Sequence, residues 1–387
     1  MEQLRLALVG CGSMAGAHVQ GLEELRKAGI DDIEVVACCD QVEEAAQQKA
    51  AALSGFQRRK PAVYTDVEEM LMRVDGLDAV DICAPHSQHH VLAVPCLEEG
   101  RHVTIEKPLA ITLRAGRRIL EAAVDSRCQL AVAENYRRSP GERARAWAVA
   151  EGRIGRPRTF YWVEAGMQMG KWGWRNFRRE AGGGWLLDGG VHFTDLFRYC
   201  LGAEAQQVMA RVREFEPYRY DKPVEREGAW PVDVEDSAMA LIDFDGGAVV
   251  QWTWQGSAPG QGFGRRTIYG SEGCIDWGSG LWTRDGRNVP NEALVAEYRQ
   301  SLTEEEEERL FPGGVENSVA TELKDFADAA RGEGVPEVDG LEGYRSQAIC
   351  MAVLESEWFR RPVTMAEIER GDLEGYQAEI DEALGIR

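Results

Sequence analysis

The sequence predicts two domains, an N-terminal α/β domain with a doubly wound parallel sheet and a C-terminal α+β domain with a mostly antiparallel open sheet. Up to about residue 134, short solid apolar runs alternate with helically spaced apolar residues, which is typical of strand–helix–strand units. From about residue 135, longer segments alternate apolar and polar residues, as strands with one covered face do. We therefore expect domains at 1–134 and 135–387, and a chain of 387 residues can bury a core in each.

The composition argues against several classes of protein. With 44 Lys and Arg against 65 Asp and Glu, the formal charge is −21, which argues against binding to nucleic acid or to an anionic membrane. No apolar run approaches the ~20 residues of a membrane helix, and a strand begins too early to leave room for a signal peptide. The nine cysteines include no C-x-x-C pair, which indicates buried free thiols. We expect a cytoplasmic protein with a small-molecule partner.

The first domain is predicted to contain buried strands that end at turn-forming or polar residues. They cover Leu4–Val9, Val35–Cys39, Ala79–Cys83, His102–Ile105 and Gln129–Ala133. A helix is expected from about Ser13, with His18 and Leu22 on its apolar stripe and Gly29 as its stop. Because ligands bind beyond the carboxyl ends of parallel strands, the residues after these strands should line one crevice.

The turn after the first strand reads Gly10-Cys11-Gly12-Ser13-Met14-Ala15, a G-x-G-x-x-A pattern that predicts a dinucleotide site in a Rossmann domain. Gly10 allows the tight turn, and Gly12 lets the backbone approach a pyrophosphate. The amides at the start of the helix, at Ser13 and Met14, face the phosphates, and the small Ala15 lets the helix lie close to the sheet.

Asp40, at the end of the second strand, favours NAD over NADP. Its carboxylate can accept hydrogen bonds from both ribose hydroxyls of an adenosine but would repel a 2′-phosphate. Gln41, the next residue, supplies no compensating cation. The alternative is that Asp40 only caps a loop, which the preceding glycine-rich turn disfavours.

Three further motifs follow. They are Ala84-Pro85-His86-Ser87-Gln88-His89, Gly100-Arg101-His102-Val103-Thr104-Ile105-Glu106-Lys107-Pro108, and the segment from Gly182 to Asp195 with its D-x-x-x-H pattern. Together with the turn they resemble the Gfo/Idh/MocA oxidoreductases, the superfamily of glucose-fructose oxidoreductase and inositol dehydrogenase. The combination of E-K-P with D-x-x-x-H is specific to the superfamily but not to a substrate. Ala15 in place of the third glycine, and His86 where the family often has Asn, are the departures.

The resemblance implies an NAD-dependent dehydrogenase whose catalytic set is Lys107, Asp188 and His192. Lys107 would position the reacting hydroxyl, and His192 would transfer its proton. If the segment from Asp188 is helical, Asp188 lies one turn from His192 and can orient the imidazole. Which of Lys107 and His192 is the proximal base stays open. The expected cofactor contacts are Gly10, Gly12, Ser13, Met14, Asp40, Ala84, Pro85, His86, His89, Glu106, Lys107 and Asn135.

His86, His89 and His90 suggest a metal cluster, but we expect no metal there. No acidic or cysteine partner lies at ligand spacing, and the segment reads as a loop and the first turn of a helix over the cofactor. His89 matches the family's usual histidine, either structural or near the nicotinamide.

The second domain should begin with strands and end with helices. Its predicted strands are Thr159–Glu164, Val208–Phe215, Ser237–Phe244, Ala248–Gln255, Arg266–Tyr269 and Cys274–Trp277. Trp252 and Trp254 share one face of the sheet. Either a second subunit covers them, since family members often pair through this sheet, or the domain's own helices do. A homo-oligomer, dimer or tetramer, is expected. Helices around 316–360 are expected to pack back toward the first domain.

Trp172, Trp174 and Arg175, just before the glycine triplet, suit a sugar, because a ring can stack on its C–H face while polar groups bind its hydroxyls. Tyr136, at the domain junction, could also reach hydroxyls of the substrate. The cations could instead hold a carboxylate or phosphate of the substrate, or the loop could be structural. The expected substrate contacts are Lys107, Tyr136, Trp172, Trp174, Arg175, Asp188 and His192.

The expected reaction is hydride transfer between NAD and a secondary hydroxyl or ketone of a sugar, an inositol-like cyclic polyol or a glycoside. Two alternatives stay open. Some relatives oxidise a sugar only transiently, so that a glycosidic bond is hydrolysed without net redox change. The fold also supports a non-catalytic NAD-dependent sensor, which the presence of Lys107, Asp188 and His192 disfavours.

Overall fold

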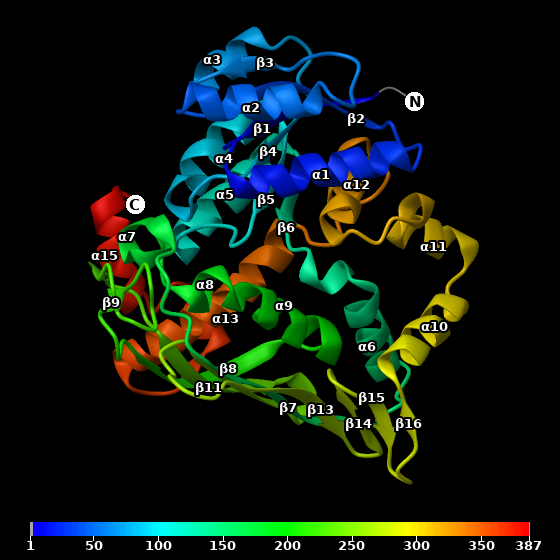
Figure 1. Cartoon of the computed structure of the whole chain (residues 1–387), viewed down its shortest axis with the longest axis vertical. Coiled ribbons are helices and arrows are strands. Elements are labelled where there is room, and N and C mark those ends of the chain that lie inside the picture. Colours follow the sequence, from blue (N-terminus) through cyan, green and yellow to red (C-terminus); the bar gives the residue numbers. More distant parts are fainter. Residues whose placement is uncertain (1–2, 387) are drawn as a thin grey trace. The chain divides into compact units, whose positions relative to one another are not determined.

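The computed structural model describes residues 3–386, which form two compact units. Unit 1 comprises residues up to Ile111, Ala115–Ser139 and Leu302–Tyr344. Unit 2 comprises Thr112–Arg114, Pro140–Ser301 and the residues from Arg345 onward. The long helix α13 (Gly340–Phe359) contributes residues to both units (Figure 1).

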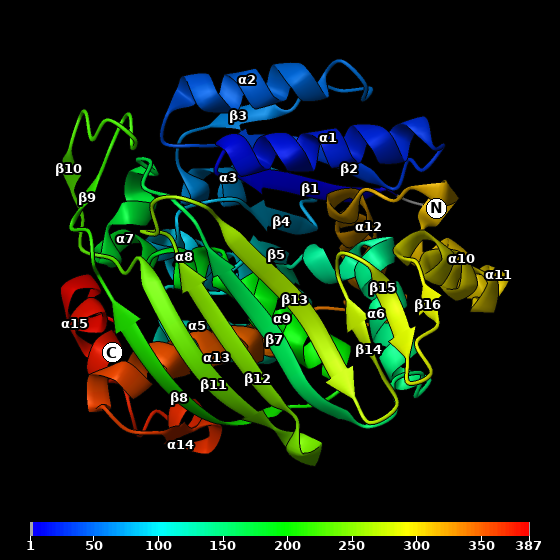
Figure 2. The same cartoon turned by 60° about the horizontal axis from the view of Figure 1, so that its bottom comes forward.

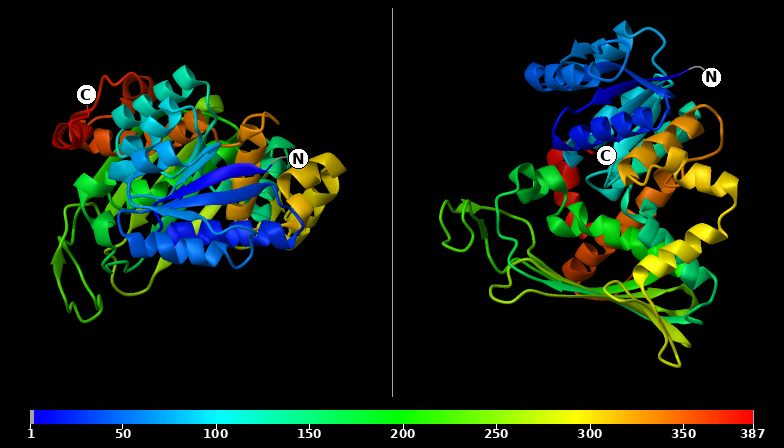
Figure 3. Two further views of the ribbon diagram at one scale, coloured as in Figure 1. Left: turned by 90° about the horizontal axis from the view of Figure 1, so that it is seen from above. Right: turned by 45° about the vertical axis from the view of Figure 1, so that its right-hand side comes forward.

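Unit 1 is built on a parallel sheet of six strands in the order β3-β2-β1-β4-β5-β6. Its strands are β1 (Leu4–Val9), β2 (Ile33–Cys39), β3 (Ala62–Tyr64), β4 (Ala79–Ile82), β5 (His102–Glu106) and β6 (Leu130–Ala133). Figure 3 shows α1 and α2 on one face of this sheet and α4 and α5 on the other. The predicted doubly wound fold is confirmed.

The helices of unit 1 connect these strands or follow them. They are α1 (Ser13–Lys27), α2 (Glu43–Leu53), α3 (Val67–Arg73), α4 (His89–Glu98), α5 (Leu113–Ser126), α11 (Glu304–Leu310) and α12 (Ser318–Ala330), with short 3₁₀ turns at His86–Gln88, Tyr136–Arg138 and Pro312–Gly314. Helix α12 packs closely on α1 at Gly21. A Cβ added at Gly21 would lie only 3.1 Å from the backbone of Ala320, so a glycine permits this approach. A helix about 300 residues away in the sequence therefore completes the core beside α1.

Unit 2 is built on a mixed sheet of nine strands in the order β16-β15-β14-β13-β7-β12-β11-β8-β17 (Figure 2). All neighbouring strands are antiparallel except β7 and β12. The strands are β7 (Pro157–Ala165), β8 (Ala205–Arg213), β11 (Ser237–Phe244), β12 (Val249–Gln255), β13 (Phe263–Gly270), β14 (Gly273–Asp276), β15 (Gly280–Thr283), β16 (Asn288–Val289) and β17 (Val363–Thr364). A separate two-stranded sheet pairs β9 (Tyr218–Arg219) with β10 (Trp230–Pro231). The predicted mostly antiparallel sheet is confirmed.

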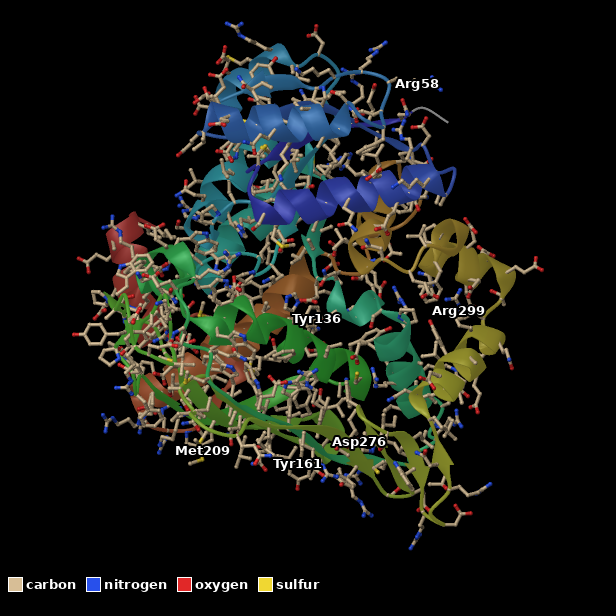
Figure 4. All side chains as sticks on the ribbon, viewed as in Figure 1. Arg58, Tyr136, Tyr161, Met209, Asp276 and Arg299 are labelled. Atoms are coloured by element: carbon tan, nitrogen blue, oxygen red, sulfur yellow. The ribbon has the colours of Figure 1, made fainter. Side chains whose placement is uncertain are left out.

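Helices cover one face of the nine-stranded sheet. Besides the part of α13 from Arg345 onward, the α-helices of unit 2 are α6 (Pro140–Ala150), α7 (Arg178–Ala181), α8 (Trp185–Asp188), α9 (Gly190–Leu201), α10 (Asn291–Ser301), α14 (Met365–Glu369) and α15 (Gly375–Leu384), with 3₁₀ turns at Gly173–Asn176 and Asp245–Gly247. Tyr161 and Met209 point away from the helices, on the opposite face (Figure 4). Met209 is 46% exposed, so apolar side chains on that face reach solvent.

The two tryptophans on β12 lie under helices of their own unit. Trp252 contacts Phe197 of α9, and Trp254 stacks on Trp185 of α8 with ring centroids 4.5 Å apart. Both indoles are buried. Of the two explanations for these residues, packing on the unit's own helices is correct, and packing against a second subunit is wrong.

Most predicted strands differ from the observed ones by one to three residues at one or both ends, and two element boundaries have a visible structural cause. Strand β8 ends at Arg213, two residues before the predicted end, because Phe215 and Glu216 turn away and donate their backbone N–H groups to the carboxylate of Asp236. The helix expected from Asp188 is divided at Gly189 into α8 and α9. Within the described residues 3–386, no helix is both long and apolar enough to cross a membrane.

Candidate functional site

The glycine-rich turn of unit 1 has the conformation that only glycine accommodates well. Gly10 has φ +83°, and a Cβ there would lie 2.6 Å from the carbonyl oxygen of Cys83. A Cβ at Gly12 would instead have no heavy atom within 4 Å. Ala15 is fully buried, so α1 packs closely on the sheet. The open space over Gly12, at the start of α1, is the position from which a helix N-terminus receives a phosphate group.

Asp40 follows β2 and lies beside the same turn. Its Oδ2 accepts a hydrogen bond from the Cys11 N–H at 2.7 Å, and its Oδ1 accepts one from the Val42 N–H at 2.8 Å. Asp40 therefore shapes both its own loop and the glycine-rich turn. Because an ionised carboxylate can accept about four hydrogen bonds, these two contacts leave capacity for a ligand.

Lys107 follows directly on β5 and is half-buried, whereas Glu106 and Pro108 are buried. The ring of His89 joins the two neighbouring strand ends. Its Nδ1 lies 2.9 Å from the Pro108 carbonyl oxygen, and its Nε2 lies 3.0 Å from that of Ala84. Burial and the neighbouring His86 lower the pKa of His89 to about 4, so the ring is neutral at pH 7 and donates to one loop at a time.

The other expected cofactor residues lie near these. His86 is buried, with its ring centroid 5.6 Å from that of His89. Asn135 and Tyr136 follow β6, where the Tyr136 N–H donates to Glu134. Tyr136 is 43% exposed (Figure 4). In unit 1, therefore, the expected cofactor contacts cluster at the carboxyl ends of β1, β2, β4, β5 and β6.

In unit 2, Asp188 is the last residue of α8 and is buried. Its Oδ1 accepts a hydrogen bond from Nε of Arg175 at 2.9 Å. The Arg175 guanidinium carbon also lies 4.3 Å from the ring centroid of Trp174 and 5.2 Å from that of Trp172. This places three of the expected substrate contacts around Asp188. His192, in the first turn of α9, is buried as well.

The glycine triplet before α8 is held by a carboxylate that the sequence does not reveal. Glu235 accepts hydrogen bonds from the N–H groups of Gly184 and Leu186, at 2.8 and 2.9 Å. A Cβ at Gly184 would lie 2.9 Å from the Glu235 carbonyl oxygen. The glycine therefore permits the close approach that sets the direction of α8 and of Asp188 at its end.

A cavity of about 320 Å³ lies beside this loop. Its lining includes Trp172 and Arg175, two of the expected substrate contacts, and also residues that were not expected to contact the substrate: Gln168, Gly170, Lys171, Asn176, Gly184, Trp185, Arg219, Val234, Glu235 and Trp254. The Nε1 of Trp254 is buried without a hydrogen-bond partner among residues 3–386. Aromatic faces next to polar groups form a surface on which a small polar ring can stack.

Comparisons with known proteins agree with this architecture. The model of the oxidoreductase family's NAD-binding Rossmann fold matches residues 4–134, and the model of its C-terminal alpha/beta domain matches residues 147–365. The 1,5-anhydro-D-fructose reductase of Ensifer adhaerens is 31% identical over 79% of this chain and 84% of its own. The levoglucosan dehydrogenase of Pseudarthrobacter phenanthrenivorans is 28% identical over 71% of this chain and 73% of its own.

Among solved structures, an oxidoreductase domain protein from Kribbella flavida superposes with a TM-score of 0.78 at 25% identity, covering 94% of this chain and 100% of the other. Both family models together span most of the chain, and the glycine-rich turn, Asp40, the E-K-P motif and the D-x-x-x-H motif all stand at the ends of elements. The chain therefore belongs to the Gfo/Idh/MocA family of NAD-dependent oxidoreductases.

Proposed function

We propose that this enzyme transfers a hydride between NAD and a secondary hydroxyl or ketone of a sugar or cyclic polyol. The observation that carries the proposal is the cavity of unit 2, which Trp172 and Arg175 help to line. The guanidinium of Arg175 also lies against the indoles of Trp172 and Trp174, and its Nε pairs with Asp188 of the D-x-x-x-H motif. The 1,5-anhydro-D-fructose reductase and levoglucosan dehydrogenase relatives, named for sugar-derived substrates, support this class.

We propose that residues 1–134, together with Asn135, bind NAD and that residues 135–387, together with Lys107, supply the substrate contacts. In the first region, the turn at Gly10–Met14 would receive the pyrophosphate and Asp40 the adenosine ribose. Ala84, Pro85, His86, His89, Glu106, Lys107 and Asn135 would lie along the nicotinamide half of the cofactor. When bound, NAD supplies the hydride acceptor of the reaction.

The residues of this chain then have to hold the alcohol and move its proton. Lys107 would donate a hydrogen bond to the reacting oxygen, and His192 would take the hydroxyl proton at one of its ring nitrogens. Asp188 would stabilise the imidazolium that forms, and Arg175 would hold the Asp188 carboxylate through its Nε. Trp172, Trp174 and Tyr136 would contact the sugar ring or its hydroxyls.

The test is a screen of polyols, monosaccharides, anhydro-sugars and glycosides with NAD, read as NADH absorbance. Net NADH with at least one substrate is the expected result. Lys107→Ala and His192→Ala should each lower kcat by about 10³-fold or more, with the Kd for NAD within about threefold of the parent.

Other outcomes separate the competing readings. Product release from a glycoside without net NADH would point to transient oxidation and hydrolysis. Tight NAD binding with no turnover across the screen would overturn the enzymatic proposal and favour a sensor. Near-normal rates in both variants would refute the roles of Lys107 and His192.

We also propose that the enzyme forms a homo-oligomer through the uncovered face of its nine-stranded sheet. Met209, Met239 and Leu241 on β8 and β11 are 46%, 47% and 51% exposed. Apolar side chains gathered on one sheet face are typical of a protein interface. Analytical ultracentrifugation should show a dimer or larger species, and Met239→Glu should lower the assembly state; a monomeric parent at micromolar concentration would refute the proposal.

A further inference from the structure

A buried histidine links three elements of unit 1. His18 lies in α1, the helix that begins at the cofactor turn, and its side chain is fully buried. Its Nδ1 lies 2.7 Å from Oδ2 of Asp81 in β4, and its Nε2 lies 3.1 Å from Oε1 of Glu106, the last residue of β5. One imidazole therefore contacts carboxylates on two neighbouring strands, β4 and β5.

This geometry calls for a proton on each ring nitrogen. An ionised carboxylate accepts hydrogen bonds and cannot donate them. Two such partners therefore favour a ring that carries a proton on both nitrogens. Burial alone would lower the pKa of His18, but the charge of Asp81, together with Cys83, outweighs it and holds that pKa well above its usual value. His18 is thus an imidazolium between two buried acids.

Two more titratable groups face the ring. The Cys83 sulfur lies 3.7 Å from Nδ1, and Oε1 of Glu322 in α12 lies 4.0 Å from Nε2. Both Glu322 oxygens are buried and find no hydrogen-bond partner within residues 3–386. Burial raises the pKa of Glu322 well above its usual value. The charges of His18 and Arg138 act to lower this pKa, whereas those of Glu106 and Glu134 raise it further. Burial thus favours the neutral form of Glu322, and the two hydrogen bonds of the His18 ring are made to Asp81 and Glu106.

A metal ion fits this cluster less well than a proton does. Ligand atoms of His18, Asp81 and Cys83 all lie within 4.8 Å of one another. However, nitrogen and oxygen ligands each ~2 Å from a tetrahedral zinc ion would be separated by roughly 3.3 Å. The 2.7 Å between Nδ1 and Oδ2 is instead the length of a charge-assisted hydrogen bond.

The contacts of His18 with Asp81 and Glu106, here called the clamp, also affect Lys107, the residue that follows Glu106 in the chain. The backbone of Glu106 pairs with Ala133 of β6, and its side chain is held by His18, so both sides of the last residue of β5 are fixed. Lys107 projects from the next position. We propose that His18 is a positioning residue for Lys107, because it ties the helix that starts at the cofactor turn to β4 and β5 and so holds the lysine at a set distance from that turn.

The inference rests on the proposed function, in which Lys107 acts on the reacting hydroxyl. The test compares the parent enzyme with His18→Gln, which removes the charge and replaces the two donor nitrogens of the ring by a single amide nitrogen. We expect kcat to fall by about 10- to 100-fold, with the KM for the substrate and the Kd for NAD within about threefold. The pH at which kcat is half-maximal should also move, because Asp81 and Glu106 lose their counter-charge.

A matched control separates positioning from general destabilisation. Val19→Ala removes buried methyl groups from the neighbouring position of the same helix and leaves the clamp intact. It should lower Tm without changing kcat or its pH profile. If kcat falls equally in both variants in step with Tm, or if His18→Gln keeps a normal kcat and profile, the inference is overturned.

Should His18→Gln fail to fold, Asp81→Asn keeps a hydrogen-bond acceptor for Nδ1 but removes one negative charge. It should shift the pH profile of kcat, and an unchanged profile would overturn the inference. Failure of the proposed function looks different: the parent enzyme would then show no Lys107-dependent turnover. Normal, Lys107-dependent turnover in His18→Gln would refute the role of His18 alone.

Discussion

Replacing each of the two glycines of the cofactor turn by alanine should have a different effect, on stability at Gly10 and on NAD binding at Gly12. At Gly10 the backbone has φ +83°, and a Cβ would meet the Cys83 carbonyl oxygen at 2.6 Å. At Gly12 no heavy atom lies within 4 Å of the added Cβ. Gly10→Ala therefore tests the conformation of the turn, and Gly12→Ala tests whether a pyrophosphate binds over this position.

The magnitudes follow from these environments. A left-handed backbone costs an alanine about 1 to 2 kcal/mol, and forcing a carbon against the backbone of Cys83, just after β4, costs about 1 to 3 kcal/mol more. Gly12 precedes α1 as its N-cap, where alanine instead of glycine costs about 1 kcal/mol or less. Its Cβ would, however, occupy the space that the pyrophosphate needs, so NAD affinity should fall at least about tenfold, or about 1.4 kcal/mol.

Thermal unfolding and NADH fluorescence titration measure the two effects separately. We expect Gly10→Ala to lose several degrees in Tm, and Gly12→Ala to lose much less in Tm but to bind NADH poorly. If Gly12→Ala binds NADH like the parent, no pyrophosphate approaches this backbone position. If Gly10→Ala is as stable as the parent, the turn does not require the conformation described.

The remaining predictions concern specificity, the acid of the D-x-x-x-H motif and pH. Asp40→Ser should reduce the preference for NAD over NADP at least about tenfold in kcat/KM, and unchanged selectivity would remove the ribose role. Arg175→Lys should lower kcat about tenfold or more, because lysine lacks the Nε that binds Asp188; a parental kcat would show that this contact does not matter in turnover. For His89, the unfolded chain takes up a proton near pH 6.5 and the folded one only near pH 4, so stability should fall by up to about 3 kcal/mol as pH drops between these values. Chemical denaturation of the parent and His89→Gln at pH 7.5 and 4.5 measures this difference, and parallel losses in both proteins would contradict it.

Much of the local structure follows from the sequence alone. The alternation of buried and exposed residues from Ser237 to Phe244 identifies β11 to the residue, because side chains of a strand alternate between two faces. The G-x-G-x-x-A turn likewise identifies the start of α1, since its glycines mark where the chain leaves β1. Such signals are local, and no distant part of the chain has to be known to read them.

Other features of the candidate site depend on residues far apart in the sequence. Arg175 and Asp188 are separated by a glycine triplet whose path is set by Glu235, which lies about 50 residues further along. His18 meets Asp81 and Glu106 only because α1 crosses β4 and β5. Whether Trp252 and Trp254 faced helices or a second subunit could not be read from alternation, because the pattern gives the same face to either partner.

The sequence by itself thus determined the element types, the cofactor turn and the family to which the chain belongs. These depend on backbone preferences and on the periodicity of apolar residues, which act over a few residues. Only the tertiary structure decided the parallel pairing of β7 with β12, the imidazolium clamp on Glu106 and the partner of Asp188. Those contacts arise from packing between distant segments, and residue spacing along the chain carries no information about which buried charges meet.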